Sequence, residues 1–562
     1  MWWAVLGIMV LSLGLEVWAV SHDLPYPGVD EPTFVRPAVH MAATGDLNPH
    51  WFGHPGSTTI YPLAGIYHVW DAVAHGASVF SPDARIAERF ATDPGAFYLI
   101  GRLWSITYAV AAIPLLFLLG RRCFTTAVGL AAAALWAVLP LAVSYGRVVR
   151  TDSAGVFFAL LALLLIVRLL DRARVRDYVL AGVVLGLGTS SRYFLVTFLA
   201  ALVVAGVLAI RRRVPGASVR RLAAGVGAAV ATFVLTTPYF LLDWSTARAS
   251  LANEDTSNLG HDGLSPIGNL RWYLGNAIPK SLTWPVALLA AIGIVVALRH
   301  WRDSRRLVLL AAVTTFVVAI SMSELHWARW PLPILPVVVL FAVGGVVWLA
   351  AASSAFLGEA AFAPALAIAG IALVALWPAK DVIQLNVRES RPSTRVVARR
   401  WIETNVPPGS ELVKELKTAP LDDTDLHWME RNTLTRDGWT LDRYVDDGFH
   451  YFVTNPGISG NFSTQPRRYP VQAHFYRELR RDGCLLHVFR PDSYRDGPVI
   501  RVYEVSDPDS TSAAARSPDC TAPSMYPAHT VAVSAPAQWT RPIGARNARP
   551  YRVHTPGGKN AP

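Results

Sequence analysis

Two adjacent acids, Asp30 and Glu31, follow the first apolar stretch of this chain. Neighbouring carboxylates are costly beside a low-dielectric surface unless a substrate or a counter-charge uses them. The acid pair therefore marks a candidate site. Its position relative to the membrane decides which substrates it could meet.

Other charged groups stand at the ends of apolar stretches. Asp152 begins one of them, two residues after Arg150. An acid at a helix start also caps the helix and suits its dipole, which is the simpler interpretation of Asp152 taken alone. Arg192 lies between two apolar stretches with no acid near it in sequence. An anionic lipid phosphate is an expected counter-ion for it, and snorkelling to headgroups is the alternative.

The composition is that of a helical membrane protein. The chain has 562 residues, of which 52% are hydrophobic and only 16% charged, and its mean hydropathy is +0.33. These values exceed those of soluble domains. The apolar residues come in runs of about twenty, which is the length that crosses a hydrocarbon core. A β-barrel would instead show shorter strands of alternating polarity. We therefore expect an all-α polytopic membrane domain.

About eleven transmembrane helices are expected. They lie near residues 2–20, 97–120, 125–145, 153–170, 178–191, 193–210, 222–243, 281–298, 307–323, 331–351 and 360–378. The first lacks a basic leader and a small-residue cleavage site, so it is expected to be a retained helix rather than a signal peptide.

Arginine clusters follow the second, fourth, sixth and eighth expected spans. They share the cytoplasmic side of the plasma (inner) membrane if the N-terminus is cytoplasmic. The acid pair and everything after residue 379 are then extracytoplasmic, as are segments 146–152, 244–280 and 324–330. This topology explains much of the net charge of +11 without nucleic acid as a partner.

We expect three regions along the chain: a membrane domain at 1–378, an extracytoplasmic α/β domain at 379–505, and a disordered tail at 506–562 that is rich in Ser, Ala, Pro and Arg. In the α/β domain, helices are expected near 393–404 and around Phe475, and strands near 411–415, 450–454, 485–489 and 498–504.

The three cysteines carry little chemistry. Cys123 is expected to be a small apolar filler, and a disulfide between Cys484 and Cys520 is plausible in an exported region. No Cys/His spacing suggests a metal site. One helical face in the first loop carries the apolar residues Leu63, Ile66, Tyr67, Trp70 and Val73. That face suits either a helix lying in the membrane interface or one packed on the spans.

Several motifs follow one another in a recognisable order. They are Asp30-Glu31, His54-Pro55, Arg150-Thr151-Asp152, Gly186 with Ser190 and Arg192, Pro-Tyr-Phe-Leu-Leu-Asp at 238–243, Arg329-Trp330-Pro331-Leu332-Pro333 with Pro336, and Trp401-Ile402 with Asn405-Val406-Pro407-Pro408-Gly409. This order resembles the bacterial and archaeal relatives of the protein O-mannosyltransferases and lipid A aminoarabinose transferases. These are integral-membrane glycosyltransferases of the GT-C fold, glycosyltransferase family 39-like.

The resemblance implies transfer of a sugar from a polyprenyl-phosphate-linked donor to an acceptor hydroxyl at the outer membrane face. The acceptor would be a glycan, a lipid or a protein, and direct displacement would invert the anomeric configuration. Such a reaction needs a carboxylate base, for which we expect Asp30, with Glu31 orienting the acceptor or the base. The leaving phosphate needs cations, for which Arg192 is the first candidate and Arg150 and Arg329 follow.

Further expectations concern the remaining residues. Asp152 is expected to position the acceptor or the arginines. His54 is a further candidate for substrate or phosphate binding. Two departures from the family pattern matter. Arg192 stands where Lys is frequent, which keeps a phosphate-pairing cation, and Gly-Ser follows His54-Pro55, which leaves the role of His54 open. No cofactor is required and no nucleotide-sugar Asp-x-Asp site is evident, although a divalent metal ion shared by Asp30 and Asp152 stays possible.

Two other classes of function are alternatives to a glycosyltransferase. A transporter or flippase of lipid-linked sugars would favour charged residues at mid-depth in the bilayer and internal repeats. This chain instead gathers its unusual residues at one face. A non-catalytic envelope scaffold would leave the acid pair and Arg192 without a purpose.

Overall fold

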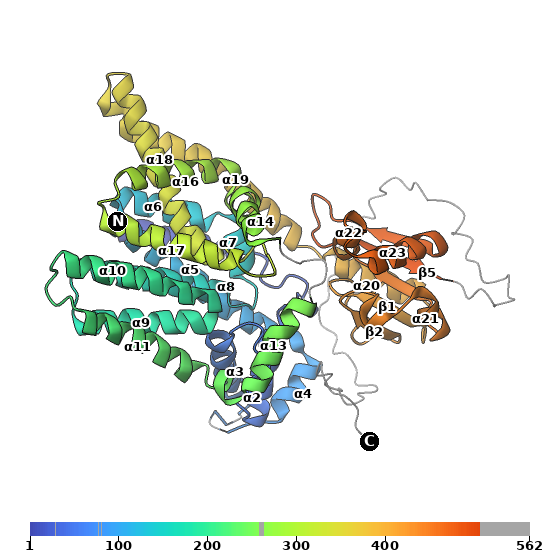
Figure 1. Ribbon diagram of the computed structural model, residues 1–562. Helices are drawn as coiled ribbons and strands as arrows, with labels where there is room; N and C mark the ends of the chain where they lie inside the picture. The colour runs from blue at the N-terminus through green and yellow to red at the C-terminus, as the bar shows by residue number, and fades with distance from the viewer. Residues whose placement is uncertain (29, 77, 80, 258–263, 506–562) are drawn as a thin grey trace. The chain divides into compact units, whose positions relative to one another are not determined.

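The computed structural model describes residues 1–505 apart from 29, 77, 80 and 258–263. These residues lie within one compact unit, Met1–Ala514. The expected tail at 506–562 and Cys520 fall outside the described residues. The fold class is confirmed: an apolar helical domain comes first, and a small α/β domain follows it (Figure 1).

A helix overlaps each of the apolar segments that the sequence predicts as spans. In chain order they are α1 (Trp2–Val17), α5 (Pro94–Cys123), α6 (Thr126–Ala137) with α7 (Pro140–Gly146), α8 (Asp152–Arg168), α9 (Val175–Ser191), η1 (Tyr193–Phe198) with α10 (Leu199–Arg211), α11 (Val219–Thr236), α16 (Trp284–Arg299), α17 (Ser304–Ser321), η3 (Leu332–Ile334) with α18 (Leu335–Phe356), and α19 (Ala363–Glu389).

By helix length and composition, the structure supports fewer membrane crossings than the eleven expected from the sequence. Among the described residues, six helices are long and apolar enough to cross a membrane, and two bent pairs raise the number to eight. The chain is therefore a multi-pass membrane protein, and eleven spans stay a prediction. One bent pair is α6 with α7, which meet at 65° where Pro140 begins the second helix.

Glycine allows the helices to approach closely. Helices α9 and α11 run side by side (Figure 1). A β-carbon at Gly182 of α9 would lie 2.0 Å from the carbonyl oxygen of Gly225 on α11. A β-carbon at Gly293 of α16 would lie 1.9 Å from the carbonyl oxygen of Phe341 on α18. Neither contact is possible for a larger residue, as is usual where membrane helices associate through small side chains.

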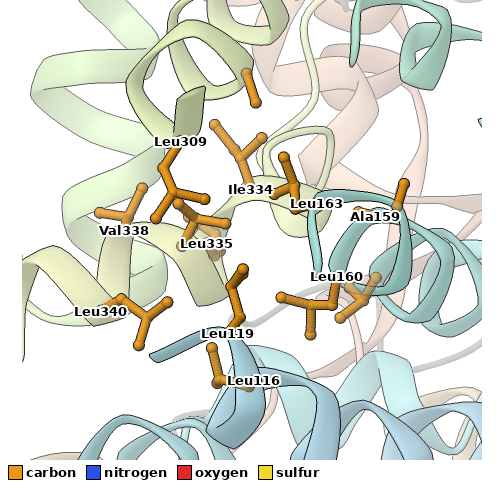
Figure 2. Packing of buried hydrophobic residues seen from close by; sticks show 14 of the residues in the cluster. Leu116, Leu119, Ala159, Leu160, Leu163, Leu309, Ile334, Leu335, Val338 and Leu340 are labelled. Carbon is orange, nitrogen blue, oxygen red and sulfur yellow. The ribbon is translucent and has the colours of Figure 1, made fainter. Parts of the chain in front are cut away.

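One large hydrophobic core joins α5, α8, α17 and α18. Figure 2 shows leucines of α5 and α8 facing Leu309 of α17 and the start of α18, with Ile334 and Leu335 between them. This packing matters for function because it fixes the beginning of α8 close to the segment that precedes η3. Asp152 begins α8 and Arg329 lies in that segment.

The described residues of the loop between α1 and α5 form three helices on a second core. These are α2 (Pro32–Thr44), α3 (Ser57–His75) and α4 (Arg85–Thr92). Leu63 and Tyr67 of α3 are fully buried against α2 and α5, and Trp70 is partly buried. Val73 remains 83% exposed. Of the two expectations for this helix, packing on the rest of the protein describes Leu63 and Tyr67.

Further helices follow α11 on the way to α16. They are α12 (Tyr239–Leu242), α13 (Trp244–Ser257), α14 (Pro266–Trp272), the π-helical turn η2 (Tyr273–Ala277) and α15 (Ile278–Leu282).

The α/β domain contains a five-stranded sheet of order β2-β1-β3-β5-β4. Its strands are β1 (Glu411–Glu415), β2 (His427–Arg431), β3 (Tyr451–Thr454), β4 (Cys484–Phe489) and β5 (Ile500–Glu504). β1 pairs in parallel with β2 and β3, and β5 runs antiparallel to both of its neighbours, β3 and β4. Its helices are α20 (Thr394–Asn405), α21 (Leu441–Asp446), α22 (Pro456–Thr464) and α23 (Pro470–Asp482).

Most of this domain follows the prediction. The four expected strands and both expected helices are present. β2 was missed because it is an edge strand whose side chains are mostly exposed, so it lacks the apolar alternation that marks a strand. The last membrane-domain helix, α19, continues to Glu389, past the expected boundary at 378. Cys123 is buried in the main core, and Cys484 is disulfide-bonded.

Candidate active site

Arg150 joins the loop between α1 and α5 to the start of α8. Its guanidinium pairs with the carboxylate of Asp30, and its Nε donates to Oδ2 of Asp152 at 2.9 Å. The side chain of Arg150 is buried, with 6% exposed, whereas that of Asp30 is 45% exposed. Asp30 is therefore open to a substrate although its counter-ion is fixed within the protein.

Asp152 is the centre of the arrangement. Its side chain is fully buried, and while Oδ2 accepts from Arg150, Oδ1 pairs with Nη1 of Arg192. The N-cap of α8 is Thr151, which caps no backbone group with its side chain. Both carboxylate oxygens of Asp152 therefore pair with arginines, so helix capping does not explain why an acid stands at this position. The four charged groups form a continuous row, Asp30–Arg150–Asp152–Arg192.

A glycine makes room for Arg192. This residue ends α9, from which its side chain reaches across the first turn of α8. A β-carbon at Gly155 would lie 2.8 Å from Cδ of Arg192. Any larger side chain at position 155 would push the arginine away from Asp152.

Arg329 brings a further cation from the segment between α17 and η3. Its guanidinium stacks on the ring of Trp327 at 4.7 Å. Tyr273 fixes this segment by accepting a hydrogen bond from the backbone N–H of Trp327 at 3.3 Å, and Asn269 fixes it by donating to the carbonyl of Ser323 at 2.9 Å. Nε of Arg329 is buried and has no hydrogen-bond partner among the described residues. It is a donor available for a ligand.

His54 lies beside these cations as a neutral ring. Burial, together with the positive charges of Arg150, Arg329 and Arg192, lowers the pKa of His54 to about 3. The imidazole therefore carries no charge at neutral pH. The expectation that His54 contributes to phosphate binding is then restricted to a hydrogen bond.

Glu31 faces a different set of partners from its neighbour. Its two oxygens accept from Nε and Nη2 of Arg102 at 2.8 and 2.7 Å. They also accept from the backbone N–H groups of Val149 at 3.1 Å and Gly28 at 2.9 Å. Burial favours the neutral acid, yet Arg102 and these donors hold the pKa of Glu31 below its usual range. The carboxylate fastens the loop that carries Asp30 to α5 and to the 146–152 segment.

Arg102 and Lys417 are site residues that the sequence reasoning missed. Arg102 had a visible signal, since it is the one cation of the apolar helix α5 that lies away from the helix end at Arg121 and Arg122. Lys417 had none, because it is one lysine of the α/β domain, distant in sequence from every other site residue. Its charge nevertheless acts on Asp30, Arg150 and Arg329.

The electrostatics favour an anionic ligand. Burial alone would raise the pKa of Asp30, but Arg150, Arg329 and Lys417 together hold it below its usual range. Asp30 is therefore ionised at neutral pH and is a weak base while paired. Among the described residues, two carboxylates, Asp30 and Asp152, lie next to four cations, Arg150, Arg192, Arg329 and Lys417. The formal positive excess suits a phosphate group.

The described residues offer a weaker candidate for a metal site than for a phosphate site. His40, Asp46 and His50, in the loop between α1 and α5, offer ligand atoms within 4.8 Å of one another. Their side chains are 51%, 41% and 54% exposed, and His50 bonds directly to Asp46 at 2.7 Å, which an ordinary surface ion pair explains. A metal ion shared by Asp30 and Asp152 would compete with two arginines for Asp152.

Comparison with known families gives a match in the same region. The family model described as dolichyl-phosphate-mannose-protein mannosyltransferase matches residues 98–242, which include Arg102, Arg150, Asp152 and Arg192. The chain resembles the GT-C glycosyltransferases. This confirms the resemblance predicted from the order of the motifs. A search of curated proteins found no match.

Solved structures of similar proteins include ArnT from Cupriavidus metallidurans and AglB from Archaeoglobus fulgidus. The apo ArnT structure is 16% identical, has a TM-score of 0.48, and aligns over 89% of this chain and 97% of its own. The structure of ArnT bound to undecaprenyl phosphate is 16% identical, has a TM-score of 0.49, and aligns over 89% of this chain and 98% of its own. The structure of the archaeal oligosaccharyltransferase AglB in complex with an inhibitory peptide and a dolichol-phosphate is 12% identical and has a TM-score of 0.45. It aligns over 84% of this chain and 70% of its own.

Proposed function

We propose that this protein transfers a sugar from a polyprenyl-phosphate-linked donor to an acceptor hydroxyl at the outer face of the plasma membrane. The observation that carries the proposal is the pairing of an open carboxylate, Asp30, with a group of cations that outnumber the acids around them. The family match over the segment that contributes three of these charged residues supports it.

The charges suit the two ends of a displacement reaction. The acceptor oxygen forms a bond to the anomeric carbon as the bond from that carbon to the phosphate oxygen breaks. The acceptor proton passes to Asp30, and the polyprenyl phosphate leaves with the bonding pair. A single displacement of this kind inverts the anomeric configuration. Arg192, Arg329 and Arg150 stabilise the charge that grows on the departing phosphate.

Donor binding would also prepare the base. In the structure, Arg150 pairs with Asp30 and so weakens it as a base. A donor phosphate that draws the guanidinium of Arg150 toward itself would loosen this pair and raise the basicity of Asp30. Asp152 keeps Arg150 and Arg192 in place meanwhile. The proposed base would therefore gain strength when the donor is present.

The neighbouring residues take supporting roles in this proposal. Glu31 positions Asp30 through Arg102 rather than meeting the acceptor. His54, as a neutral imidazole, supplies a hydrogen bond to the sugar or to the phosphate. None of these steps uses a metal ion.

The proposal is tested in cells that depend on the protein. We expect Asp30→Asn to stop sugar transfer and to cause the lipid-linked donor to accumulate in the membrane, where mass spectrometry of extracted lipids identifies the sugar. Asp46→Asn serves as the matched control, because Asp46 is an acid of the same outer loop that pairs with His50. The proposal fails if Asp30→Asn, present at the wild-type level in the membrane, neither stops transfer nor accumulates a lipid-linked sugar.

A further inference from the structure

The segment after β1 of the α/β domain carries a lysine in an unfavourable backbone conformation. Lys417 has φ of 65°, in the left-handed region that residues with a β-carbon seldom adopt. It follows directly on the end of a parallel strand, where α/β proteins commonly place ligand-binding residues. Such strained positions persist only where surrounding contacts enforce them, and they concentrate at functional sites.

Hydrogen bonds on both sides enforce this conformation. The N–H of Leu416 donates to the carbonyl of Arg431 at 2.9 Å, and Nε of Arg395 donates to the carbonyl of Thr418 at 3.2 Å. Nη1 of the same Arg395 donates to the carbonyl of Pro27 at 3.1 Å. One buried guanidinium therefore ties the Lys417 segment to the stretch of chain that leads to Asp30.

Other contacts join the same two segments. The N–H of Ser393 donates to Oδ1 of Asp23 at 2.9 Å, and the guanidinium of Arg399 lies 4.4 Å from the ring centre of Tyr26. Residues 23–27 thus meet the start of the α/β domain at several independent points. The position of Lys417 beside the active site does not depend on the lysine itself.

The ammonium of Lys417 lies among the site cations. It is 5.4 Å from the ring centre of Trp327, and the guanidinium of Arg329 lies 4.7 Å from the same ring. No carboxylate lies within ion-pair distance of Lys417 among the described residues. Burial lowers the pKa of Lys417, and Arg329 and Arg150 lower it further against the opposing effect of Asp30.

We propose that Lys417 is a binding residue for the phosphate of the polyprenyl-phosphate donor, so that the α/β domain completes the active site of the membrane domain. The proposal rests on the function proposed above and names the residue through which the exported domain takes part. A half-buried ammonium beside two guanidinium groups is unfavourable until an anion joins them. The lysine side chain is long enough to follow the phosphate as the sugar leaves.

The alternative role for Lys417 is to fasten the two parts of the protein through Trp327. Binding and fastening predict different results for three variants. Lys417→Ala removes the charge, Lys417→Arg keeps it, and Arg395→Ala loosens the segment without removing a charge that faces the site. Lys280→Ala is the matched control, because Lys280 is an exposed lysine of α15.

The experiment measures binding of undecaprenyl phosphate to the purified full-length protein in detergent, with donor KM from transfer assays beside it. We expect Lys417→Ala to weaken binding about tenfold, which is the loss of one charge-assisted hydrogen bond. Lys417→Arg should bind undecaprenyl phosphate within about threefold of the wild-type affinity, because it keeps the charge. Lys280→Ala should bind it with the wild-type affinity. The thermal unfolding midpoint of each variant is measured alongside by intrinsic tryptophan fluorescence.

Two results would overturn the proposal. One is unchanged binding in Lys417→Ala. The other is equal weakening in Lys417→Ala and Lys417→Arg together with a lowered unfolding midpoint, which is the signature of fastening. Asp30→Asn separates this inference from the proposed function, since it should abolish transfer and leave undecaprenyl phosphate bound. If Asp30→Asn is inactive while Lys417→Ala binds normally, only the inference about Lys417 fails.

Discussion

Asp30 and Glu31 are neighbours in sequence, yet their surroundings predict opposite consequences when each loses its charge. The Glu31 side chain is 1% exposed and that of its partner Arg102 is 6% exposed. Glu31→Gln would leave the Arg102 guanidinium buried beside a neutral amide. Removing one partner of a buried pair costs about 3–5 kcal/mol. Arg102 keeps two carbonyl partners, Val20 and His22, so we expect the lower end of this range, about 3 kcal/mol.

Asp30→Asn should behave differently. Its side chain is 45% exposed, and Arg150 retains Asp152 when Asp30 is neutralised. We expect no measurable loss of stability and a loss of sugar transfer of about a hundredfold or more, the usual contribution of a general base.

The assay for this pair is the free energy of unfolding from SDS titration of the purified protein in mixed micelles. The double variant Glu31→Gln/Arg102→Met is the control, since it removes both charges of the pair. It should recover more than half of the stability that Glu31→Gln loses, because replacing both partners of a buried pair is far less costly than removing one. The reasoning is refuted if Glu31→Gln is as stable as the wild type, or if the second change brings no recovery.

Two further predictions concern the row of charges. Burial raises the pKa of Asp30, and Arg150 is the first of the groups that lower it. Arg150→Gln should therefore raise the pKa of Asp30 and move the acidic limb of the pH–rate profile to higher pH. An acidic limb that stays in place would show that Asp30 does not control it. Gly155→Ala should displace Arg192, lower the rate of transfer and cost about 1–3 kcal/mol through overpacking. Gly227→Ala, where a β-carbon meets nothing within 4 Å, should leave the rate unchanged and should not lower the free energy of unfolding by SDS titration, since alanine favours the helix over glycine.

Much of the architecture was predictable because the membrane imposes strong patterns on a sequence. Long apolar runs located the helices, and the match between the expected 97–120 and α5 (Pro94–Cys123) is within a few residues. Turn residues such as Pro407-Pro408-Gly409 bounded the strand of the α/β domain that follows them. The helix bounds of the 125–145 segment were less accessible, because the bend before Pro140 depends on how α6 and α7 pack.

The candidate site was only partly predictable. Asp30, Asp152 and Arg192 stood out because charges beside apolar helices need a reason. Their partners did not stand out. That Asp152 lies between two arginines depends on how α8 and α9 pack at Gly155, which no local pattern encodes. Lys417 depends on the docking of a whole domain, so a sequence contains no signal for it short of the folded structure.

The central claim is that Asp30 accepts the acceptor proton beside a cationic phosphate site. The most direct measurement is single-turnover transfer by the purified, reconstituted protein, using the lipid-linked sugar that accumulates in Asp30→Asn cells. The account predicts that the wild type and Asp46→Asn convert this donor at equal rates, while Asp30→Asn binds it and converts about a hundredfold less or none. Conversion by Asp30→Asn at the wild-type rate would contradict the account.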